Sequence, residues 1–202
     1  MSARDEILRR VRRAGVDGPE LPGHDGPWST VEDPAARFRE MVRAVGGSVV
    51  DVSGVEGPDG LSVAAGRTVA DLGARVVWSV IDGVLRRDVD LSSGRNPHAA
   101  DAVDFALARG TLGVAENGAI WVDERGLGCR SVLFLTQHLG LVLDASAVVD
   151  HMHAAYARLE TDPGVGERFG LFISGPSKTA DIEQALVLGA HGACSLTVFL
   201  VT

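Results

Sequence analysis

Apolar residues in this chain follow two kinds of pattern, short uninterrupted runs and stripes with helical spacing. The runs are long enough for buried strands and are bounded by turn-forming residues. They lie at 48–52, 74–78, 112–115, 119–122, 132–135, 138–143, 169–173 and 196–201. Helical segments are expected at 2–14, 34–45, 61–72, 101–109, 145–159 and 179–188. Because helices and strands alternate along the chain, the pattern predicts an α/β layered fold.

The first predicted helix is amphipathic and basic. Ser2 and Asp5 form an approximate capping box at its start, and its apolar stripe is narrow. Five arginines surround that stripe, namely Arg4, Arg9, Arg10, Arg12 and Arg13. They are either the solvated face of a docked helix or a contact surface for an acidic partner.

A linker rich in Gly and Pro, at 15–27, follows the first helix. Asp33 and Pro34 then supply the N-cap and the first position of the next helix. We therefore divide the chain into an N-terminal helix with its linker, residues 1–33, and one domain, residues 34–202.

The segment after the run at 169–173 has the form strand, tight loop and helix start. Gly175 and Pro176 are suited to the turn, because Gly tolerates unusual backbone angles and Pro fixes its own φ. Ser177, Lys178 and Thr179 would then stand at a helix N-terminus, where free N–H groups and the helix dipole favour an anion. The alternative is an ordinary helix cap, with Thr179 as N-cap and acids in the first turn.

A second feature is Glu116-Asn117-Gly118, which separates two short apolar runs. Asn-Gly between such runs predicts a β-hairpin with a type I′ turn.

His138 begins another predicted strand, and a histidine beside apolar residues is usually a structural residue. His151 and His153 are two positions apart on one helix, so they do not face each other as a metal pair would.

Composition narrows the class of protein. The 202 residues suffice for one sizeable domain, with 46% hydrophobic residues and a net charge of −8. This acidic balance argues against a nucleic-acid-binding protein.

No apolar run is long enough for a transmembrane segment, and the charged N-terminus does not resemble a signal peptide, so we expect a cytoplasmic protein. The only cysteines, Cys129 and Cys194, are too few for a four-cysteine cluster, and two free thiols are favoured over a disulfide.

The C-terminal part of the chain resembles a known family. Residues 175–183, Gly-Pro-Ser-Lys-Thr-Ala-Asp-Ile-Glu, are followed by Gly189-Ala190-His191-Gly192. This combination resembles the signature of the LutC/YkgG lactate-utilisation family, whose members carry a LUD domain. The resemblance is clearest from Gly110 to Thr202, and the family's usual Pro after the second motif is replaced by Ala193.

The resemblance implies a three-layer fold like that of NagB, RpiA and CoA transferases, with a mixed central sheet. It also implies a subunit of a system that oxidises L-lactate to pyruvate with iron–sulfur partners, which are LutA-like and LutB-like proteins. This chain itself would hold no metal and no cofactor. Alternatives are a stand-alone superfamily enzyme acting on a phosphosugar, CoA ester or folate, and a non-catalytic assembly or regulatory subunit, so whether the chain is itself an enzyme stays open.

The same resemblance assigns candidate roles to residues. Glu116 and His138 would be catalytic, as a carboxylate at a strand end and a proton-transfer group. A substrate or another small anion would be bound by the remaining candidates: Asn117, Gly118, Gly175, Pro176, Ser177, Lys178, Thr179, Ala180, Asp181, His191 and Gly192. Because open α/β sheets bind ligands beyond their strand ends, we expect these groups in one pocket at one end of the sheet.

Overall fold

The protein is an α/β structure in which one parallel sheet lies between helices and a second sheet. The computed structural model describes residues 2–15, 26, 28, 30–53, 57–91, 96–125, 127–162, 169–182 and 185–202. Its α-helices are α1 (Ala3–Ala14), α2 (Pro34–Ala44), α3 (Gly57–Asp71), α4 (Val132–Leu135) and α5 (Met152–Thr161). Two short 3₁₀ helices accompany them, η2 (Pro97–Ala102) and η3 (Ala145–Ala147).

The central sheet has five strands in the order β1-β11-β6-β3-β2, and every pairing in it is parallel. These strands are β1 (Ser48–Val52), β2 (Val77–Ser79), β3 (Phe105–Arg109), β6 (His138–Asp144) and β11 (Ser195–Val201). Both faces of the sheet are covered, which explains why β3, β6 and β11 are nearly continuous apolar runs rather than alternating ones.

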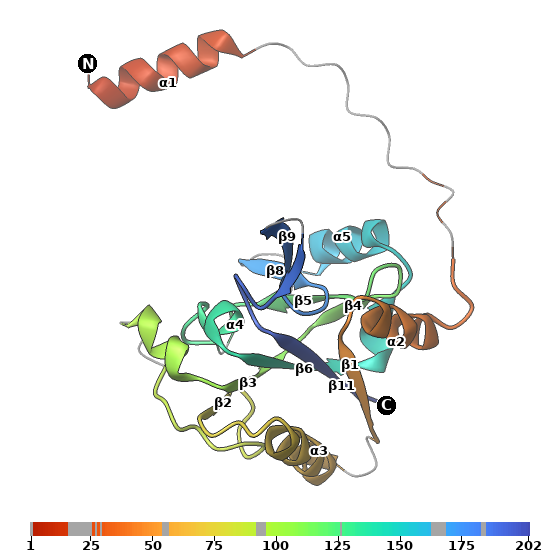
Figure 1. Ribbon diagram of the computed structural model, residues 1–202. Helices are drawn as coiled ribbons and strands as arrows, with labels where there is room; N and C mark the ends of the chain where they lie inside the picture. Colours follow the sequence, from red (N-terminus) through yellow and green to blue (C-terminus); the bar gives the residue numbers. More distant parts are fainter. Residues whose placement is uncertain are drawn as a thin grey trace.

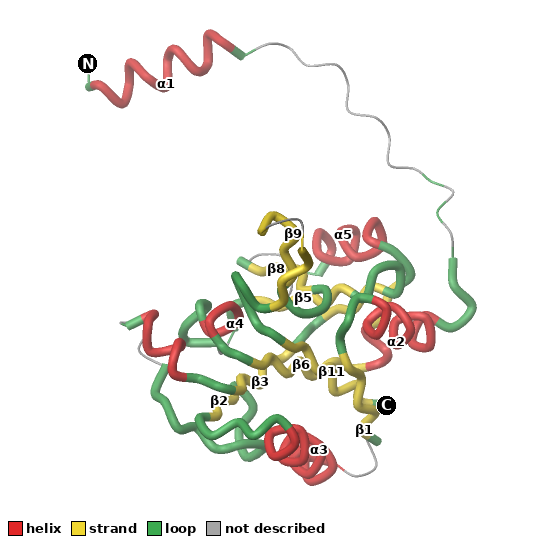
Figure 2. Tube along the Cα trace, viewed as in Figure 1, coloured by secondary structure: helices red, strands yellow, loops and turns green. Residues whose placement is uncertain are grey.

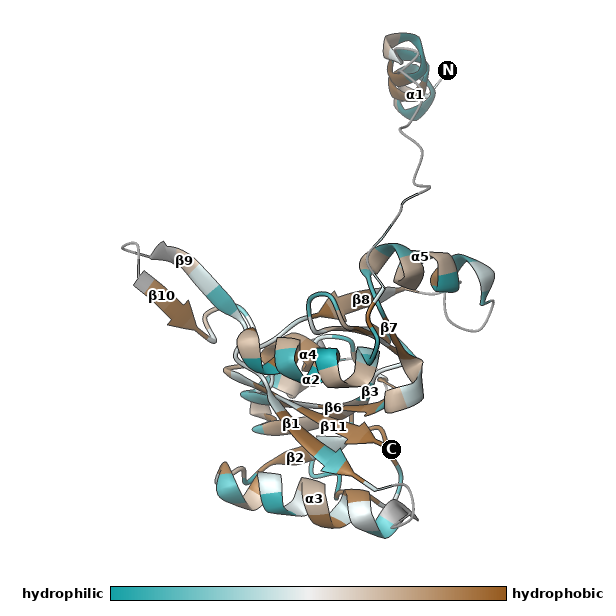
Figure 3. Cartoon of the chain, turned by 90° about the vertical axis from the view of Figure 1, so that its right-hand side faces the viewer, coloured by the Kyte–Doolittle hydropathy of each residue, from teal (hydrophilic) through white to brown (hydrophobic). Residues whose placement is uncertain are grey.

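A second sheet of four strands has the order β7-β4-β5-β8 and contains both parallel and antiparallel pairs. Its strands are β4 (Leu112–Val114), β5 (Ala119–Asp123), β7 (Val148–Val149) and β8 (Gly170–Ile173). A third sheet is the hairpin of β9 (Lys178–Ile182) and β10 (Ala185–Leu188), which pair with each other. Figure 3 shows this hairpin extending away from the body of the protein.

The layers are visible in Figures 1 and 2. Helix α3 covers one face of the central sheet, and α2, α4 and the second sheet cover the other. Helix α5 lies on the outer side of the second sheet, where Ala155 and Leu159 are buried. Helix α1 stands apart from this body and has no buried residue. The predicted α/β layered fold is therefore confirmed.

Several predicted elements are confirmed. Helix α1 has the expected capping box of Ser2 and Asp5. Helix α2 begins at the expected N-cap Asp33, whose side chain accepts a hydrogen bond from the N–H of Ala36, with Pro34 in its first turn. The hairpin at Asn117-Gly118 is also present, but its loop has four residues, 115–118, rather than two. The expected linker at 15–27 lies almost wholly outside the described residues.

Four secondary-structure predictions are wrong. Residues 105–109 form strand β3 rather than a helix, because their place between β2 and β6 overrides their helical composition. The short apolar run 132–135 is a helical turn, α4, rather than a strand. The helix expected from residue 145 begins only at Met152, after η3 and β7. The helix expected at 179–188 is the hairpin of β9 and β10.

Asp104 ties the loop before β2 to the start of β3. Its Oδ2 accepts hydrogen bonds from the backbone N–H groups of Val76 (2.9 Å) and Arg75 (2.8 Å), which hold the pKa of this carboxyl below its ordinary value of 3.8. A carboxyl whose pKa is lowered by folding stabilises the protein above its unfolded-state pKa, and this contribution is lost as the pH falls through its folded-state pKa.

We therefore predict that Asp104→Asn lowers the melting temperature at pH 7, and that its difference from the parent shrinks as the pH falls below about 4. The amide keeps the shape of the side chain but removes the charge. Melting curves between pH 7 and pH 3 measure this convergence. A difference that stays constant over the whole range would show that the charge of Asp104 contributes nothing.

Candidate functional site

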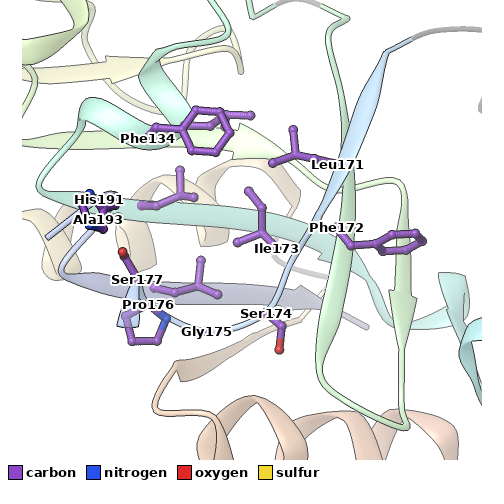
Figure 4. A pocket seen from close by; sticks show the side chains of 14 residues that line it. Phe134, Leu171, Phe172, Ile173, Ser174, Gly175, Pro176, Ser177, His191 and Ala193 are labelled. Carbon is purple, nitrogen blue, oxygen red and sulfur yellow. The ribbon is translucent and has the colours of Figure 1, made fainter. Parts of the chain in front are cut away.

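A pocket of about 290 Å³ opens between β8, α4, the base of the β9–β10 hairpin and the first residues of β6 and β11. Its walls are mostly apolar, and Figure 4 shows their side chains around the cavity. The lining residues are Leu133, Phe134, Leu139, Leu171, Phe172, Ile173, Ser174, Gly175, Pro176, Ser177, His191, Gly192, Ala193 and Leu196. Of these, His191 alone has an ionisable side chain. The pocket lies at the amino-terminal ends of β6 and β11, whereas parallel sheets commonly bind ligands at the carboxyl ends.

Two segments of the predicted site meet in this pocket. Gly175, Pro176 and Ser177 come from the loop after β8, and His191 and Gly192 come from the turn before β11. Backbone hydrogen bonds join the two segments, because the N–H of Ser177 donates to the carbonyl of Ala193 (2.9 Å) and the N–H of Gly189 donates to the carbonyl of Ser177 (2.9 Å). This backbone pairing fixes where the side chains of Ser177 and His191 stand.

The polar side chains of Ser177 and His191 remain available to a ligand. Among the described residues, no hydrogen bond is made by the Ser177 hydroxyl or by the imidazole of His191. Figure 4 shows Ser177 at the cavity wall with its hydroxyl directed along it, and His191 beside Ala193. A hydroxyl and an imidazole beside an apolar wall suit a small ligand that has both an apolar group and a polar group.

The loop before Ser177 is held against the end of α2. Gly175 has a φ of +71°, and a Cβ at this position would lie 2.5 Å from the carbonyl oxygen of Val45. The ammonium of Lys178 donates a hydrogen bond to that same carbonyl. Ser174 donates through its hydroxyl to the carbonyl of Asn117 (2.8 Å), which connects the loop to the β4–β5 hairpin. The loop is therefore fixed from two sides.

The anion-binding hypothesis requires a helix N-terminus at Lys178, but this residue lies in a strand. Lys178, Thr179 and Ala180 belong to strand β9, so no helix N-terminus presents its N–H groups there. None of these three residues lines the pocket, and Lys178 is directed to α2. The side chain of Asp181 lies outside the described part of the chain. Ser177 is the one member of the Ser-Lys-Thr sequence that lines the pocket.

Glu116 does not face the pocket. It is exposed, and its Oε2 accepts a hydrogen bond from the N–H of Met152 (3.0 Å), the first residue of α5. A carboxylate in this position satisfies a free N–H group and complements the helix dipole. Its neighbours Asn117 and Gly118 pack toward Ser174 and α2 instead. The expectation that Glu116 shares a pocket with Lys178 and His191 is therefore wrong.

His138 lies on the other face of the central sheet. Successive side chains of a strand point to opposite faces. Leu139 lines the pocket, so His138 points to the face covered by α3, where the neighbouring residue of β3, Phe105, belongs to the core beneath that helix. Its Nδ1 is 2.8 Å from the hydroxyl oxygen of Ser195 on β11. His138 is thus also absent from the pocket.

The two cysteines, Cys129 and Cys194, are not joined in a disulfide. Cys129 is buried with its sulfur 2.9 Å from the hydroxyl oxygen of Ser131, and Cys194 is exposed. Within the described ranges, no three His, Cys, Asp or Glu side chains are grouped as metal ligands. In the same part of the chain, every helix is too short or too polar to cross a lipid bilayer.

Sequence reasoning missed the apolar half of the pocket. Leu133 and Phe134 were assigned to a strand but come from α4, and Leu171 and Ile173 were treated only as core residues of a strand. One available signal was the alternation along β8, because residues 171 and 173 must share the face opposite to Phe172. Leu171 and Ile173 pack against the main core, and Phe172 packs toward α5.

We predict that Lys178→Ala changes both stability and function little. The ammonium contacts the end of α2, the side chain is exposed, and it lies outside the pocket. Surface substitutions of this kind usually alter the free energy of unfolding by less than about 0.5 kcal/mol. Chemical denaturation measures the change in stability, and the activity of the variant relative to that of the parent measures the change in function. A large loss of activity in a stable variant would place the lysine in the functional site after all.

Comparison with known proteins agrees with the resemblance seen in the sequence. A family model described as the LUD domain matches residues 68–201. Lactate utilization protein C of Geobacillus thermodenitrificans is 33% identical over 115 residues, which are 55% of this chain and 48% of that protein. Lactate utilization protein C 1 of Bacillus mycoides is 31% identical over 96 residues, 46% of this chain and 41% of that protein. The chain thus spans about half the length of the curated relatives it matches, or less.

Among solved structures, a crystal structure of a DUF162 family protein from Deinococcus radiodurans superposes with a TM-score of 0.62 and 19% sequence identity. The match covers 87% of this chain and 100% of that one, and at this identity it supports the fold alone. The LUD-domain match extends from α3 to the last strand and includes all the residues that line the pocket. Since it covers well over half of the sequence, this chain belongs to the LUD domain family.

Proposed function

We propose that this chain is a subunit of a lactate-utilisation system that oxidises L-lactate to pyruvate together with iron–sulfur partner proteins. The support is the family, the names of the matched relatives, and one structural observation. Ser177 and His191 come from the two halves of the family-like motif and meet at one pocket, and their side chains form no hydrogen bond among the described residues. Within this proposal, the pocket is the ligand site.

The chemistry of the pocket is compatible with a 2-hydroxy acid. The methyl group of lactate would contact apolar residues such as Leu139 and Leu196. Its oxygens would form hydrogen bonds with the side chains of Ser177 and His191. Oxidation of lactate to pyruvate removes two electrons and two protons. His191 would take up the hydroxyl proton as general base, and the second proton and the two electrons would pass to the partner proteins.

A reconstitution experiment tests the proposal. The chain is purified together with its LutA-like and LutB-like partners, and pyruvate formation from L-lactate is followed with an artificial electron acceptor. We expect oxidation only when this chain is present. Equal oxidation by the partners alone would exclude a role for the chain in the reaction.

A non-catalytic assembly role is the second candidate, and the contacts of three proposed functional residues favour it. Glu116 bonds to the start of α5, Lys178 to the end of α2, and His138 to Ser195. Each of these side chains thus serves a structural purpose. The same observation disfavours a stand-alone enzyme with Glu116 as its catalytic carboxylate. If the assembled system needs the chain but tolerates loss of the pocket's polar groups, the assembly role is the correct one.

The proposal predicts that the chain alone contains no stoichiometric iron–sulfur cluster. A four-iron cluster needs about four thiolate ligands, and the sequence has two cysteines, of which Cys129 is buried. Iron analysis and visible absorption of anaerobically purified protein measure this, with an iron–sulfur partner as the positive control. Four irons per chain would contradict the prediction and would point to ligands shared between chains.

A further inference from the structure

Helix α1 is amphipathic, but its apolar side chains are not buried against the rest of the described protein. Its apolar residues Ile7, Leu8 and Val11 are 61%, 37% and 63% exposed, and none of its residues is buried. Among the described residues, no hydrogen bond or ion pair joins α1 to the rest of the chain. Figure 3 shows it well separated from the body. The helix is therefore stabilised only by its own contacts.

Those contacts are too few for a stable free helix. Helices shorter than about 12–15 residues are marginal in water, and α1 has 12 residues. Its capping box and the ion pairs of Glu6 with Arg9 and Arg10 help locally, but exposed pairs of this kind contribute little. The apolar stripe nevertheless follows the spacing of a helix that binds in a groove, with Ile7, Val11 and Ala14 at i, i+4 and i+7. A helix of this design gains its stability on binding.

The charge of α1 indicates the chemistry of its partner. Five arginines and two acids give the helix a net charge of +3, whereas the whole chain has −8. Glu6 engages Arg9 and Arg10, and no ion pair is seen for Arg4, Arg12 or Arg13 within the described part of the chain. At about 100° per residue, Arg4 lies on the same side of α1 as the stripe and Arg12 lies next to it beside Leu8, whereas Arg13 lies on the opposite face. Arg4 and Arg12 would therefore meet acidic residues at the rim of an apolar groove. Complementary charge of this kind accelerates association and makes it dependent on salt.

We propose that α1 is the segment by which this chain docks to a partner protein, in an apolar groove with an acidic rim. This inference rests on the proposed function, because the partner is one of the iron–sulfur proteins of the same system. Residues 16–33 connect α1 to α2 and can span up to about 60 Å, so the helix can bind while the domain keeps its own position. A membrane surface fits less well, because the stripe is narrow and has no aromatic residue.

Binding of the full chain to each purified iron–sulfur partner tests the proposal. The double substitution Ile7→Asp with Val11→Asp should weaken binding at least about tenfold, since it removes two buried apolar side chains from the contact. The double substitution Arg4→Glu with Arg12→Glu should weaken binding and reduce its dependence on salt. Because α1 contributes nothing to the core of the domain, these variants should keep the melting temperature of the parent.

Two substitutions on α3 serve as matched controls. Val63→Asp changes a valine that is 51% exposed, and Arg67→Glu reverses the charge of an exposed arginine, so both should bind like the parent. If the parent and the α1 variants bind equally well, α1 is not the docking segment, although the proposed function stands. If the parent binds neither partner, both ideas fail. If the α1 variants lose only self-association, or only binding to vesicles of anionic lipid, the proposal is overturned in favour of that contact.

Discussion

Gly118→Ala is expected to destabilise the protein strongly, by about 2–5 kcal/mol. Gly118 ends the β4–β5 loop with a φ of +68°, and its missing side chain faces the backbone of α2. A Cβ there would lie 2.9 Å from the N of Val42 and 3.0 Å from the carbonyl carbon of Met41. A helix backbone cannot rotate away as a flexible side chain can, so α2 or the hairpin must shift. Chemical denaturation measures the loss.

Gly73→Ala is the matched control for this prediction. Gly73 has nearly the same backbone angle, with a φ of +67°, but nothing lies within 4 Å of the position its Cβ would take. The control therefore measures the cost of the left-handed conformation alone, about 1–2 kcal/mol. The difference between the two variants isolates the contact between the hairpin and α2. Equal losses would mean that this contact is looser than the structure indicates.

The elements that sequence reasoning found are those with local signals. The capping residues of α1 and α2 and the Asn-Gly turn act within a few residues, so they could be recognised without knowing the fold. The buried strands β6, β8 and β11 were found as apolar runs. The fold class followed from their alternation with helices, but the order of the strands could not, because pairing such as that of β1 with β11 joins opposite ends of the domain.

The errors arose where local preference and tertiary context disagree. The run Val132–Leu135 is too short for its period to distinguish helix from strand. The residues at positions 182, 185, 186 and 189 have the spacing of one helix face, yet 178–182 and 185–188 pair with each other as a hairpin. The same error placed Lys178 at a helix N-terminus and created the expectation of an anion site. The incorrect helix assignment at 179–188 therefore led to an argument for anion binding at a helix N-terminus that is not there.

The candidate site was predicted in part. The two motif segments at 175–177 and 191–192 do meet, which no spacing rule could have shown, because β9 and β10 separate them. Glu116 and His138 do not join them. For His138 the sequence indicates only that its side chain and that of Leu139 point to opposite faces of the strand, and the structure shows that the pocket is on the side of Leu139. For Glu116 the sequence contains no such indication, since its partner Met152 is 36 residues away.

His191→Ala and Ser177→Ala are expected to lower lactate oxidation by the assembled system by about one to two orders of magnitude each. In the part of the chain that the structure describes, the side chains of these two pocket residues form no hydrogen bond, and loss of one bond to a charged ligand costs about 1.5–3 kcal/mol. Ser177→Ala keeps the Cβ that packs near Gly192, and His191 is exposed, so neither change should disturb the fold. Steady-state rates and melting curves of both variants separate function from stability.

His98→Ala is the control for the loss of an imidazole. His98 is an exposed histidine of η2 that does not line the pocket, so its variant should oxidise lactate like the parent. If His191→Ala is as active as His98→Ala while Ser177→Ala is inactive, the ligand is held by the hydroxyl and the base lies elsewhere. If both pocket variants keep full activity in a system that still requires the chain, the pocket is not a lactate site. The contacts of Glu116, Lys178 and His138 would then support the assembly role, since each of these three side chains bonds to another part of the fold.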